Sequence, residues 1–268
     1  MQELSDRTFG RIAAVMHATV GLSFMPNKKP LVSSRLAPRI QRLGLPSFEA
    51  YAEIIESGED GGEFQAAIDL LTTNETYFFR EPAHYELLEK TLAADKPRTL
   101  RVWSAASSFG DEAYSTAMLL ADMAQNGRIG SDWQVLGTDI SDRVLKSAAQ
   151  GIFPEERLRA VSAERLRRYC LRGEGDSAGL VQIQPKLCER VRFGQLNLCE
   201  RISDLGPFDV VLLRNVLIYF DPPTKAAVVD RVLTQLRPGG LFFIGTAEGR
   251  VPCNTPLNTL APGAFRKP

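Results

Sequence analysis

From residue 98 onward, the chain alternates between short apolar runs and longer segments with helical periodicity. Helices are predicted between the runs, over 111–124, after Ser141 and over 224–236. The runs themselves are TLRVWSA, WQVLGTDI, VRFGQLNL, FDVVLLRNVL and LFFIGTA. Strands that are buried on both faces have such continuous apolar sequences, so the pattern predicts a doubly wound, mostly parallel sheet in an α/β domain over residues 87–268.

The first 70 residues have a helical pattern instead. Thr8, Phe9, Ile12 and Val15 form one face of a predicted helix, and residues 48–55 form the face of another. We therefore predict a small all-α domain over residues 1–70, followed by a linker over residues 71–86.

A basic segment lies between these two helices. Its cations are Lys28, Lys29, Arg35, Arg39 and Arg42. The three arginines are spaced i, i+4 and i+7, so on a helix they share one face. Because Pro38 lies among them, either the helix is kinked there or it begins near Ala37 with Pro38 in its first turn. The face is either a docking surface for an acidic partner or a solvated helix surface.

Residues 172–184, RGEGDSAGLVQIQ, do not fit the α/β alternation. Gly173, Gly175 and Gly179 interrupt the chain, and LVQIQ alternates as a half-exposed strand does. This predicts a β-hairpin in a small subdomain, at about residues 172–190, inserted in the larger domain.

Composition excludes several classes of protein. Thirty-two basic residues balance thirty-two acidic ones, so nothing indicates a nucleic-acid partner. Four separated cysteines, without a CxxC pair or a leader sequence, indicate reduced thiols in a cytoplasmic protein, and no apolar run has the length of a membrane span. The two histidines are not in metal-ligand spacing, so neither a metal nor a Ser-His triad is expected.

Candidate chemistry lies after the strands, because ligands in open α/β sheets bind beyond their carboxyl ends. The first predicted strand leads into a loop of small residues, 104–112, which lets backbone approach a ligand but has no GxGxxG. Asp139 ends the second strand and would bind a ribose or cap the next helix, which Ser141 could do equally well. Asn197 and the pair Arg214-Asn215 follow the next strands, where they would meet an adenine edge or a loop carbonyl.

The segment NETYFFRE, residues 74–81, has two interpretations that are compatible. Arg80 could bind a carboxylate in a two-pronged manner. The aromatic residues could also pack the small domain onto the large one.

Taken together, these segments resemble the CheR family, the chemotaxis-receptor glutamate methyltransferases. The resemblance covers nearly the whole chain and includes TTNETYFFREP at 72–82, VWSAASSFGDEAYS at 102–115, GTDIS at 137–141, FDVVLLRNVLIYFD at 208–221 and LRPGG at 236–240. It implies a Rossmann-like class I methyltransferase domain with an inserted antiparallel β-subdomain, preceded by an all-α domain. It also implies methyl transfer from S-adenosylmethionine to receptor glutamates, giving methyl esters and S-adenosylhomocysteine.

The resemblance assigns roles to residues at matching positions. Asn74, Thr76, Arg80 and Glu112 would hold the methionine end of the cofactor, Asp139 the ribose, and Asn197, Leu198, Arg214 and Asn215 the adenosine. Arg80 and Tyr219 would be the catalytic residues, with Tyr219 near the reacting methyl group.

It also implies how the partner is held. The basic segment would dock the acidic helices of the receptor's cytoplasmic bundle. The hairpin, with Arg172, Gly173, Gly175 and Gly179, would bind a C-terminal receptor pentapeptide by edge-strand addition, although Gln182 and Gln184 stand where such members often carry arginine. A monomer recruited to receptor arrays in the cytoplasm is the corresponding expectation.

Two departures from the family pattern lie in the cofactor loop. Ala106 stands at a usual glycine, and Phe109, at a usual threonine, is expected to narrow the loop. One alternative function is an adaptor that binds S-adenosylhomocysteine and only docks on receptors, against which the intact Arg80, Asp139 and Asn215 argue. Another is methylation of small carboxylic acids, which would need neither a basic domain nor a hairpin.

Overall fold

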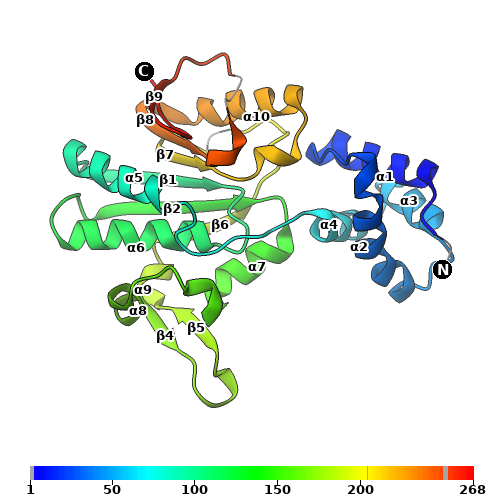
Figure 1. Ribbon diagram of the computed structural model, residues 1–268, viewed down its shortest axis with the longest axis horizontal. Coiled ribbons are helices and arrows are strands. Elements are labelled where there is room, and N and C mark those ends of the chain that lie inside the picture. The colour runs from blue at the N-terminus through cyan, green and yellow to red at the C-terminus, as the bar shows by residue number, and fades with distance from the viewer. Residues whose placement is uncertain (1–2, 204, 250–252) are drawn as a thin grey trace.

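A computed structural model describes residues 3–203, 205–249 and 253–268 and shows a seven-stranded sheet at the centre of the molecule (Figure 1). The strand order is β6-β2-β1-β7-β8-β10-β9, with the first five strands parallel and the last two antiparallel. The strands are β1 Thr99–Ala105, β2 Asp132–Asp139, β6 Val191–Gln195, β7 Phe208–Leu213, β8 Leu236–Ile244, β9 Asn258–Ala261 and β10 Ala264–Arg266. The predicted doubly wound, mostly parallel sheet is thus confirmed.

Side-chain alternation along the strands places helices on both faces of this sheet. Val102, Leu212 and Phe243 belong to one buried cluster, which α5 Pro82–Asp95 and α6 Asp111–Gln125 cover. Trp103 and Phe242 point the opposite way, into a cluster beneath α10 Pro222–Thr234. Because successive residues of a strand face opposite sides, both faces of the sheet need an apolar cover. Helix α7 Asp142–Gln150 adds to this cover by packing against β2 and β6.

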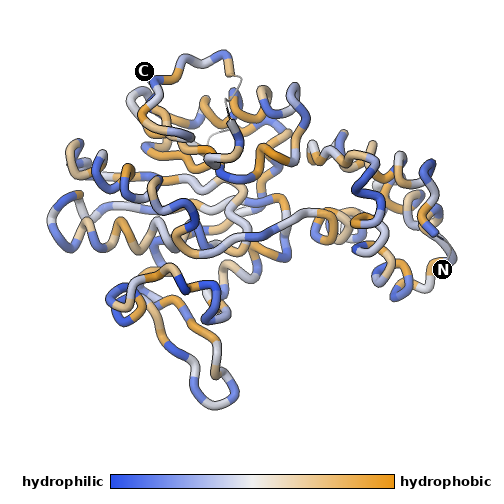
Figure 2. Tube along the Cα trace, in the orientation of Figure 1, coloured by the Kyte–Doolittle hydropathy of each residue, from blue (hydrophilic) through white to orange (hydrophobic). Residues whose placement is uncertain are grey.

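Four helices form the N-terminal domain, at the right of Figure 1. They are α1 Asp6–Val20, α2 Lys29–Arg42, α3 Phe48–Ser57 and α4 Gly61–Leu71, with a short 3-10 turn, Pro26–Lys28, before α2. Their apolar faces meet in a core of their own that includes Ile12, Leu36 and Tyr51. Figure 2 shows orange and blue alternating along these helices, as expected for one buried face each.

Helix α2 decides between the two alternatives for the basic segment. It begins at Lys29 with Pro30 in its first turn, not near Ala37, and it continues through Pro38. Pro38 cannot donate to the carbonyl of Ser34, but both residues are exposed, so water can reach that carbonyl. Three buried side chains on the opposite face, Val32, Leu36 and Ile40, hold the helix in place.

The β-subdomain projects from the large domain as a three-stranded antiparallel sheet of order β3-β5-β4. The hairpin predicted near residue 172 is β4 Cys170–Arg172 with β5 Leu180–Ile183. The sheet also includes β3 Ile152–Pro154, which the sequence pattern did not indicate because three residues are too few to show a period. Helices α8 Ala163–Tyr169 and α9 Pro185–Cys188 and the 3-10 turn η2 Glu155–Leu158 complete the subdomain.

Candidate functional site

One pocket of about 970 Å³, its open mouth included, lies at the carboxyl ends of the parallel strands. Segment 72–80 crosses it, and Val20 and Leu22 of the N-terminal domain close one side. All ten residues expected at the cofactor or at catalysis line it, namely Asn74, Thr76, Arg80, Glu112, Asp139, Asn197, Leu198, Arg214, Asn215 and Tyr219. The structure therefore brings together side chains from positions 74 to 219.

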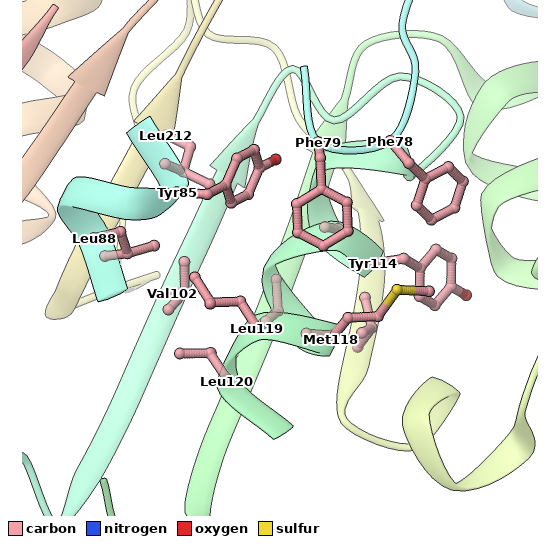
Figure 3. Close-up of a cluster of buried hydrophobic side chains, with 14 of the residues drawn as sticks. Phe78, Phe79, Tyr85, Leu88, Val102, Tyr114, Met118, Leu119, Leu120 and Leu212 are labelled. Carbon is pink, nitrogen blue, oxygen red and sulfur yellow. The ribbon is translucent and has the colours of Figure 1, made fainter. Parts of the chain in front are cut away.

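The aromatic residues of segment 72–80 anchor it to the large domain. Phe78 and Phe79 are buried and pack toward Tyr114 and Met118 of α6 (Figure 3). The amide of Phe79 also donates to Ser115 Oγ at 2.9 Å. Arg80, which follows, lines the pocket and donates to the carbonyl of Glu75 at 2.9 Å. The segment thus carries both an anchor and an arginine that faces the pocket. Phe78 and Phe79, however, pack into the large domain and do not join the small domain to it.

The loop after β1 forms the floor of the pocket. Ser107 N donates to Thr138 O at 2.7 Å, and Ala106, Ser107 and Ser108 line the cavity. Ala106 and Ser108 have φ of 64° and 52°, a region that costs non-glycine residues energy and that often marks functional sites. Phe109 does not line the pocket. Its ring packs against the large-domain core, with the Arg157 guanidinium 4.7 Å from its centroid, so the expectation that it narrows the cofactor loop is wrong.

Asp139 is held with its carboxylate at the pocket wall. It accepts hydrogen bonds from the amides of Ser108 at 2.8 Å and Ser141 at 3.0 Å, and its burial raises its pKa. Ser141 itself is the N-cap of α7, accepting from Val144 N. Capping therefore does not need Asp139, and each of its oxygens keeps a lone pair for a further donor such as a sugar hydroxyl.

An ion-pair network forms the wall beside Arg80. Arg214, almost completely buried, donates to Glu112 Oε2 at 2.9 Å and to the carbonyl of Arg80, and it lies 3.5 Å from Glu81. Burial lowers the pKa of Arg214, but Glu112, Tyr85 and Glu81 outweigh that effect and raise it. The guanidinium thus stays charged and fixes two acidic side chains and the main chain of Arg80 around one corner of the pocket.

Two asparagines at strand ends have different environments. Asn215, with φ of 58°, donates to Glu81 at 3.0 Å. Asn197 donates to the carbonyl of Thr19, at the end of α1, at 2.7 Å. This carbonyl belongs to the last turn of a helix and not to a loop, as one of the two alternatives had it. Asn197 thus links the domains while also lining the pocket.

Sequence reasoning missed Glu248 as a support of the site. Its carboxylate accepts from the amides of Asn215 at 3.0 Å, Leu217 at 2.7 Å and Gly245 at 2.6 Å, which fixes the turn after β7. Burial raises the pKa of Glu248, and the three amides oppose the rise. The position of Glu248 just beyond the end of β8 was the one indication of this role in the sequence. Val20 and Leu22 gave no indication that they line the pocket, because their pattern is that of ordinary core residues of a helical domain.

Tyr219 lies on the short turn that Glu248 supports. It is half-buried, its carbonyl accepts from Ser23 N at 2.9 Å, and burial raises the pKa of its phenol. At neutral pH the hydroxyl is therefore protonated and can donate a hydrogen bond into the pocket.

The lining of the pocket fits S-adenosylmethionine. Ser107 Oγ and Arg214 Nε are buried polar atoms without a hydrogen-bond partner in the described part of the chain, and both residues line the cavity. Such orphaned atoms are costly unless a ligand pairs with them. The free acceptors of Asp139 suit a ribose, and Arg80 suits a carboxylate.

Neither a metal centre nor a membrane segment is apparent in what the structure describes. Across residues 3–203, 205–249 and 253–268 no three acidic, histidine or cysteine side chains are grouped for metal binding. Within the same ranges, no helix combines the length and the apolar character that crossing a bilayer requires.

Comparison with known proteins assigns the chain to a family. Residues 7–72 match the CheR methyltransferase, all-alpha domain, and residues 74–260 match the CheR methyltransferase, SAM binding domain. The Chemotaxis protein methyltransferases of Escherichia coli and Klebsiella aerogenes are 41% and 42% identical over 246 residues, which cover 91% of this chain and 85% and 84% of theirs. Chemotaxis protein methyltransferase 2 of Pseudomonas aeruginosa is 38% identical over 91% of this chain and 86% of its own. The chain therefore belongs to the CheR methyltransferase family, whose members bind S-adenosylmethionine and transfer its methyl group.

Proposed function

We propose that the chain methylates specific glutamate side chains on the cytoplasmic helical domains of chemoreceptors, forming glutamyl methyl esters for sensory adaptation. The single observation that supports this most is the convergence of ten matching residues, from Asn74 to Tyr219, on one pocket. In addition, the chain aligns with chemotaxis protein methyltransferases over 91% of its own length and 85–86% of theirs. Cytoplasmic location at receptor arrays and action as a monomer follow as parts of the same proposal.

The proposed roles follow the geometry of the pocket. Arg80, Asn74, Thr76 and Glu112 would hold the amino-acid end of the cofactor, Asp139 the ribose, and Asn197, Leu198, Arg214 and Asn215 the adenosine. When bound, S-adenosylmethionine supplies an electrophilic methyl group on a positively charged sulfur. A receptor glutamate with a pKa of about 4.3 is already ionised at neutral pH, so the site needs no general base. Arg80 and Tyr219 would orient the carboxylate, since in-line positioning alone can lower a barrier by about 7–11 kcal/mol.

We also propose a division of labour along the chain. Residues 1–70 would dock the receptor, residues 71–86 would link the domains and contribute cofactor contacts, and residues 87–268 would bind the cofactor. The predicted docking cations are not equally available for this. Lys29 pairs with Asp6 at 2.6 Å, Arg39 pairs with Glu63, and Arg35 donates to the carbonyl of Leu71 at 2.9 Å.

The most available docking surface is an open depression between α2, α4 and α7. Five cations line it, with two aspartates among them, so both domains contribute to an excess of positive charge. The cations are Arg35, Arg39, Arg42, Arg143 and Lys146, and the aspartates are Asp69 and Asp142, which pairs with Lys146. An acidic receptor helix is the complementary partner. Of the α2 cations, Arg42 is exposed and forms no ion pair within the described residues, whereas Lys28 lies before this helix.

Charge reversal tests this docking surface. Arg42→Glu should raise the KM for a receptor fragment several-fold without changing the affinity for S-adenosylhomocysteine, because it lies outside the cofactor pocket. Lys90→Glu on α5, also exposed, is the matched control and should change neither quantity. Equal KM values for the two variants would rule out docking on this face.

The β-subdomain is the proposed tether for a receptor C-terminal pentapeptide. Strand β4 is at the edge of the sheet and, among the described residues, pairs with β5 alone. Leu171 of β4 and Leu180 of β5 expose apolar side chains there. An extended peptide added to this edge would gain main-chain hydrogen bonds and apolar contacts. Receptor fragments with and without their last five residues should then differ in KM, and equal KM values would exclude the tether.

The glycines of the predicted tether have a structural explanation. A Cβ at Gly173 would lie 2.1 Å from the carbonyl oxygen of Ser177, and Gly175 and Gly179 have φ of 56° and 85°. They are therefore needed to form the loop between β4 and β5. Arg172 lies 3.1 Å from Glu155 in an exposed pair, which leaves its guanidinium available to a peptide carboxylate.

Transfer of labelled methyl to purified receptor fragments tests the function itself. Label on the receptor that mild alkali releases would be a glutamyl ester, as we expect. Binding of S-adenosylhomocysteine without transfer to any of several receptors would favour the adaptor, and transfer only to small carboxylic acids would favour the third function considered above.

A further inference from the structure

Arg157 lies where the β-subdomain, the loop after β1 and segment 72–80 meet. It belongs to η2, directly after β3. Its guanidinium makes a two-pronged contact with the carboxylate of Asp111, with Nε donating to Oδ1 at 3.0 Å. Asp111 is completely buried and is the first residue of α6, directly after the pocket loop. A subdomain residue therefore holds the start of the helix that follows the pocket loop.

The same residue also contacts both chain segments that supply the pocket. The guanidinium carbon lies 4.7 Å from the centre of the Phe109 ring and 5.6 Å from that of Phe153. The carbonyl of Arg157 accepts from the amide of Phe78 at 3.2 Å. Phe109 follows Ser108 of the pocket loop, and Phe78 lies between Thr76 and Arg80. Ser108 Oγ also donates directly to the carbonyl of Asn74 at 3.1 Å. One side chain and one carbonyl that do not line the pocket themselves thus add a second connection between the two segments.

The electrostatics make this contact hard to replace. Burial raises the pKa of Asp111 to about 6, and the Arg157 guanidinium opposes that rise. Without a cation the buried carboxylate would have to take up a proton or move toward water, and either change would displace the first turn of α6. Lysine would restore the charge but neither the two-pronged contact nor the guanidinium over the Phe109 ring.

We propose that Arg157 is a positioning residue of the cofactor pocket, which sets the pocket loop and segment 74–80 against each other through Asp111, Phe109 and Phe78. The β-subdomain thereby supports cofactor binding, in addition to any contact with a peptide. The inference rests on the proposed assignment of the pocket to S-adenosylmethionine.

The test compares full-length variants by their dissociation constant for S-adenosylhomocysteine and by their KM and kcat. Arg157→Gln should weaken S-adenosylhomocysteine binding about 10- to 100-fold and raise the KM for S-adenosylmethionine, because small misplacements of a site have effects of this size. The kcat at saturating cofactor should stay within about twofold, because no atom of Arg157 faces the reacting groups. Arg157→Lys should fall between wild type and Arg157→Gln in affinity.

Arg168→Gln is the matched control. Arg168 is also in the subdomain and also pairs with an aspartate of α6, at 2.8 Å from Asp122, but at the far end of that helix. The Arg168→Gln variant should have a lower free energy of unfolding but an unchanged affinity for S-adenosylhomocysteine. Unchanged affinity in a folded Arg157→Gln, or an equal loss in Arg168→Gln, would overturn the proposal. If Arg157→Gln does not fold, wild-type affinity in Arg157→Lys would overturn it and an intermediate affinity would support it. A wild-type protein that fails to bind S-adenosylhomocysteine would instead refute the pocket assignment.

Discussion

At the scale of single residues, backbone strain is concentrated around the pocket. Six non-glycine residues have positive φ in the described ranges, and five of them, all except Lys96, lie in the segments that form the pocket wall. They are Phe79, Glu81, Ala106, Ser108 and Asn215. Each costs roughly 1–3 kcal/mol, so the surrounding hydrogen bonds must hold them in place. At Asn215 that support is Glu248 on its amide and Glu81 on its side chain.

Substitution of Gly245 tests whether Asn215 must keep this position for cofactor binding. A Cβ at Gly245 would lie 2.4 Å from Asn215 Nδ2, far inside van der Waals contact. Gly245→Ala should therefore displace Asn215, lower the free energy of unfolding by about 1–3 kcal/mol and weaken S-adenosylhomocysteine binding. Denaturant unfolding and calorimetry measure the two effects. Gly194→Ala in β6, where a Cβ would meet nothing within 4 Å, is the control. Equal affinities for the two variants would contradict a role for Asn215 at the cofactor.

At the scale of elements, tertiary packing overrides local propensity in α2. An interior proline costs a helix about 3 kcal/mol, whereas burying the side chains of Val32, Leu36 and Ile40 contributes roughly 5–9 kcal/mol in total. The packing term is larger, so the helix continues through Pro38. The sequence left two alternatives open, a helix with Pro38 in its interior or one that begins near Ala37, because the burial of these three residues was not known.

Replacing Pro38 measures what the proline costs. Pro38→Ala restores a donor for the carbonyl of Ser34 and should raise the free energy of unfolding by about 2–2.6 kcal/mol, the helix gain of about 3 kcal/mol less about 0.4–1 kcal/mol for the added freedom of the unfolded chain. Pro30→Ala, in the first turn, gives no such hydrogen bond and should lower the free energy of unfolding by about 0.4–1 kcal/mol. Urea unfolding of both variants gives the comparison. A loss of stability in Pro38→Ala would show that the ring itself stabilises the domain.

At the scale of the whole molecule, the N-terminal domain is part of the cofactor pocket. Its helix α1 ends against the large domain, where Asn197 binds the carbonyl of Thr19 and Ser23 binds the carbonyl of Tyr219. His17 Nε2 lies 2.7 Å from Asp221, the N-cap of α10. The domain expected to dock receptors therefore also shapes the site of chemistry.

The hydrogen bonds that Asp221 accepts as the N-cap of α10, together with its contact to His17, predict a pH dependence. Hydrogen bonds from Thr224 and His17 lower the pKa of Asp221 to about 2 from 3.8. A carboxylate with a lowered pKa stabilises the fold above its unfolded pKa and loses that effect as the pH falls through its folded pKa. The urea midpoint of wild type should thus exceed that of Asp221→Asn above about pH 4, and the difference should shrink toward pH 2. A difference that stays constant down to pH 2 would contradict a stabilising role for the ionised carboxylate of Asp221.

Much of the fold and of the site's location could be predicted, for identifiable reasons. Asp139, Asn197 and Asn215 follow apolar strands, and the carboxyl ends of parallel strands meet at one edge, so their convergence follows from topology. Contacts between domains, such as that of Leu22 with the pocket, have no local pattern. Supports such as Glu248 and Arg157 act through loops whose path depends on the finished structure.

The most direct test of the central claim, that these strand ends form one cofactor pocket, is S-adenosylhomocysteine binding by Asp139→Asn. The substitution keeps the shape of the side chain but removes the charge that would accept ribose hydroxyls, and charged hydrogen bonds contribute about 1.5–3 kcal/mol. The account predicts affinity at least about tenfold below wild type, and unchanged affinity in Asp142→Asn, a partly exposed residue outside the pocket. Wild-type affinity in a folded Asp139→Asn would contradict it.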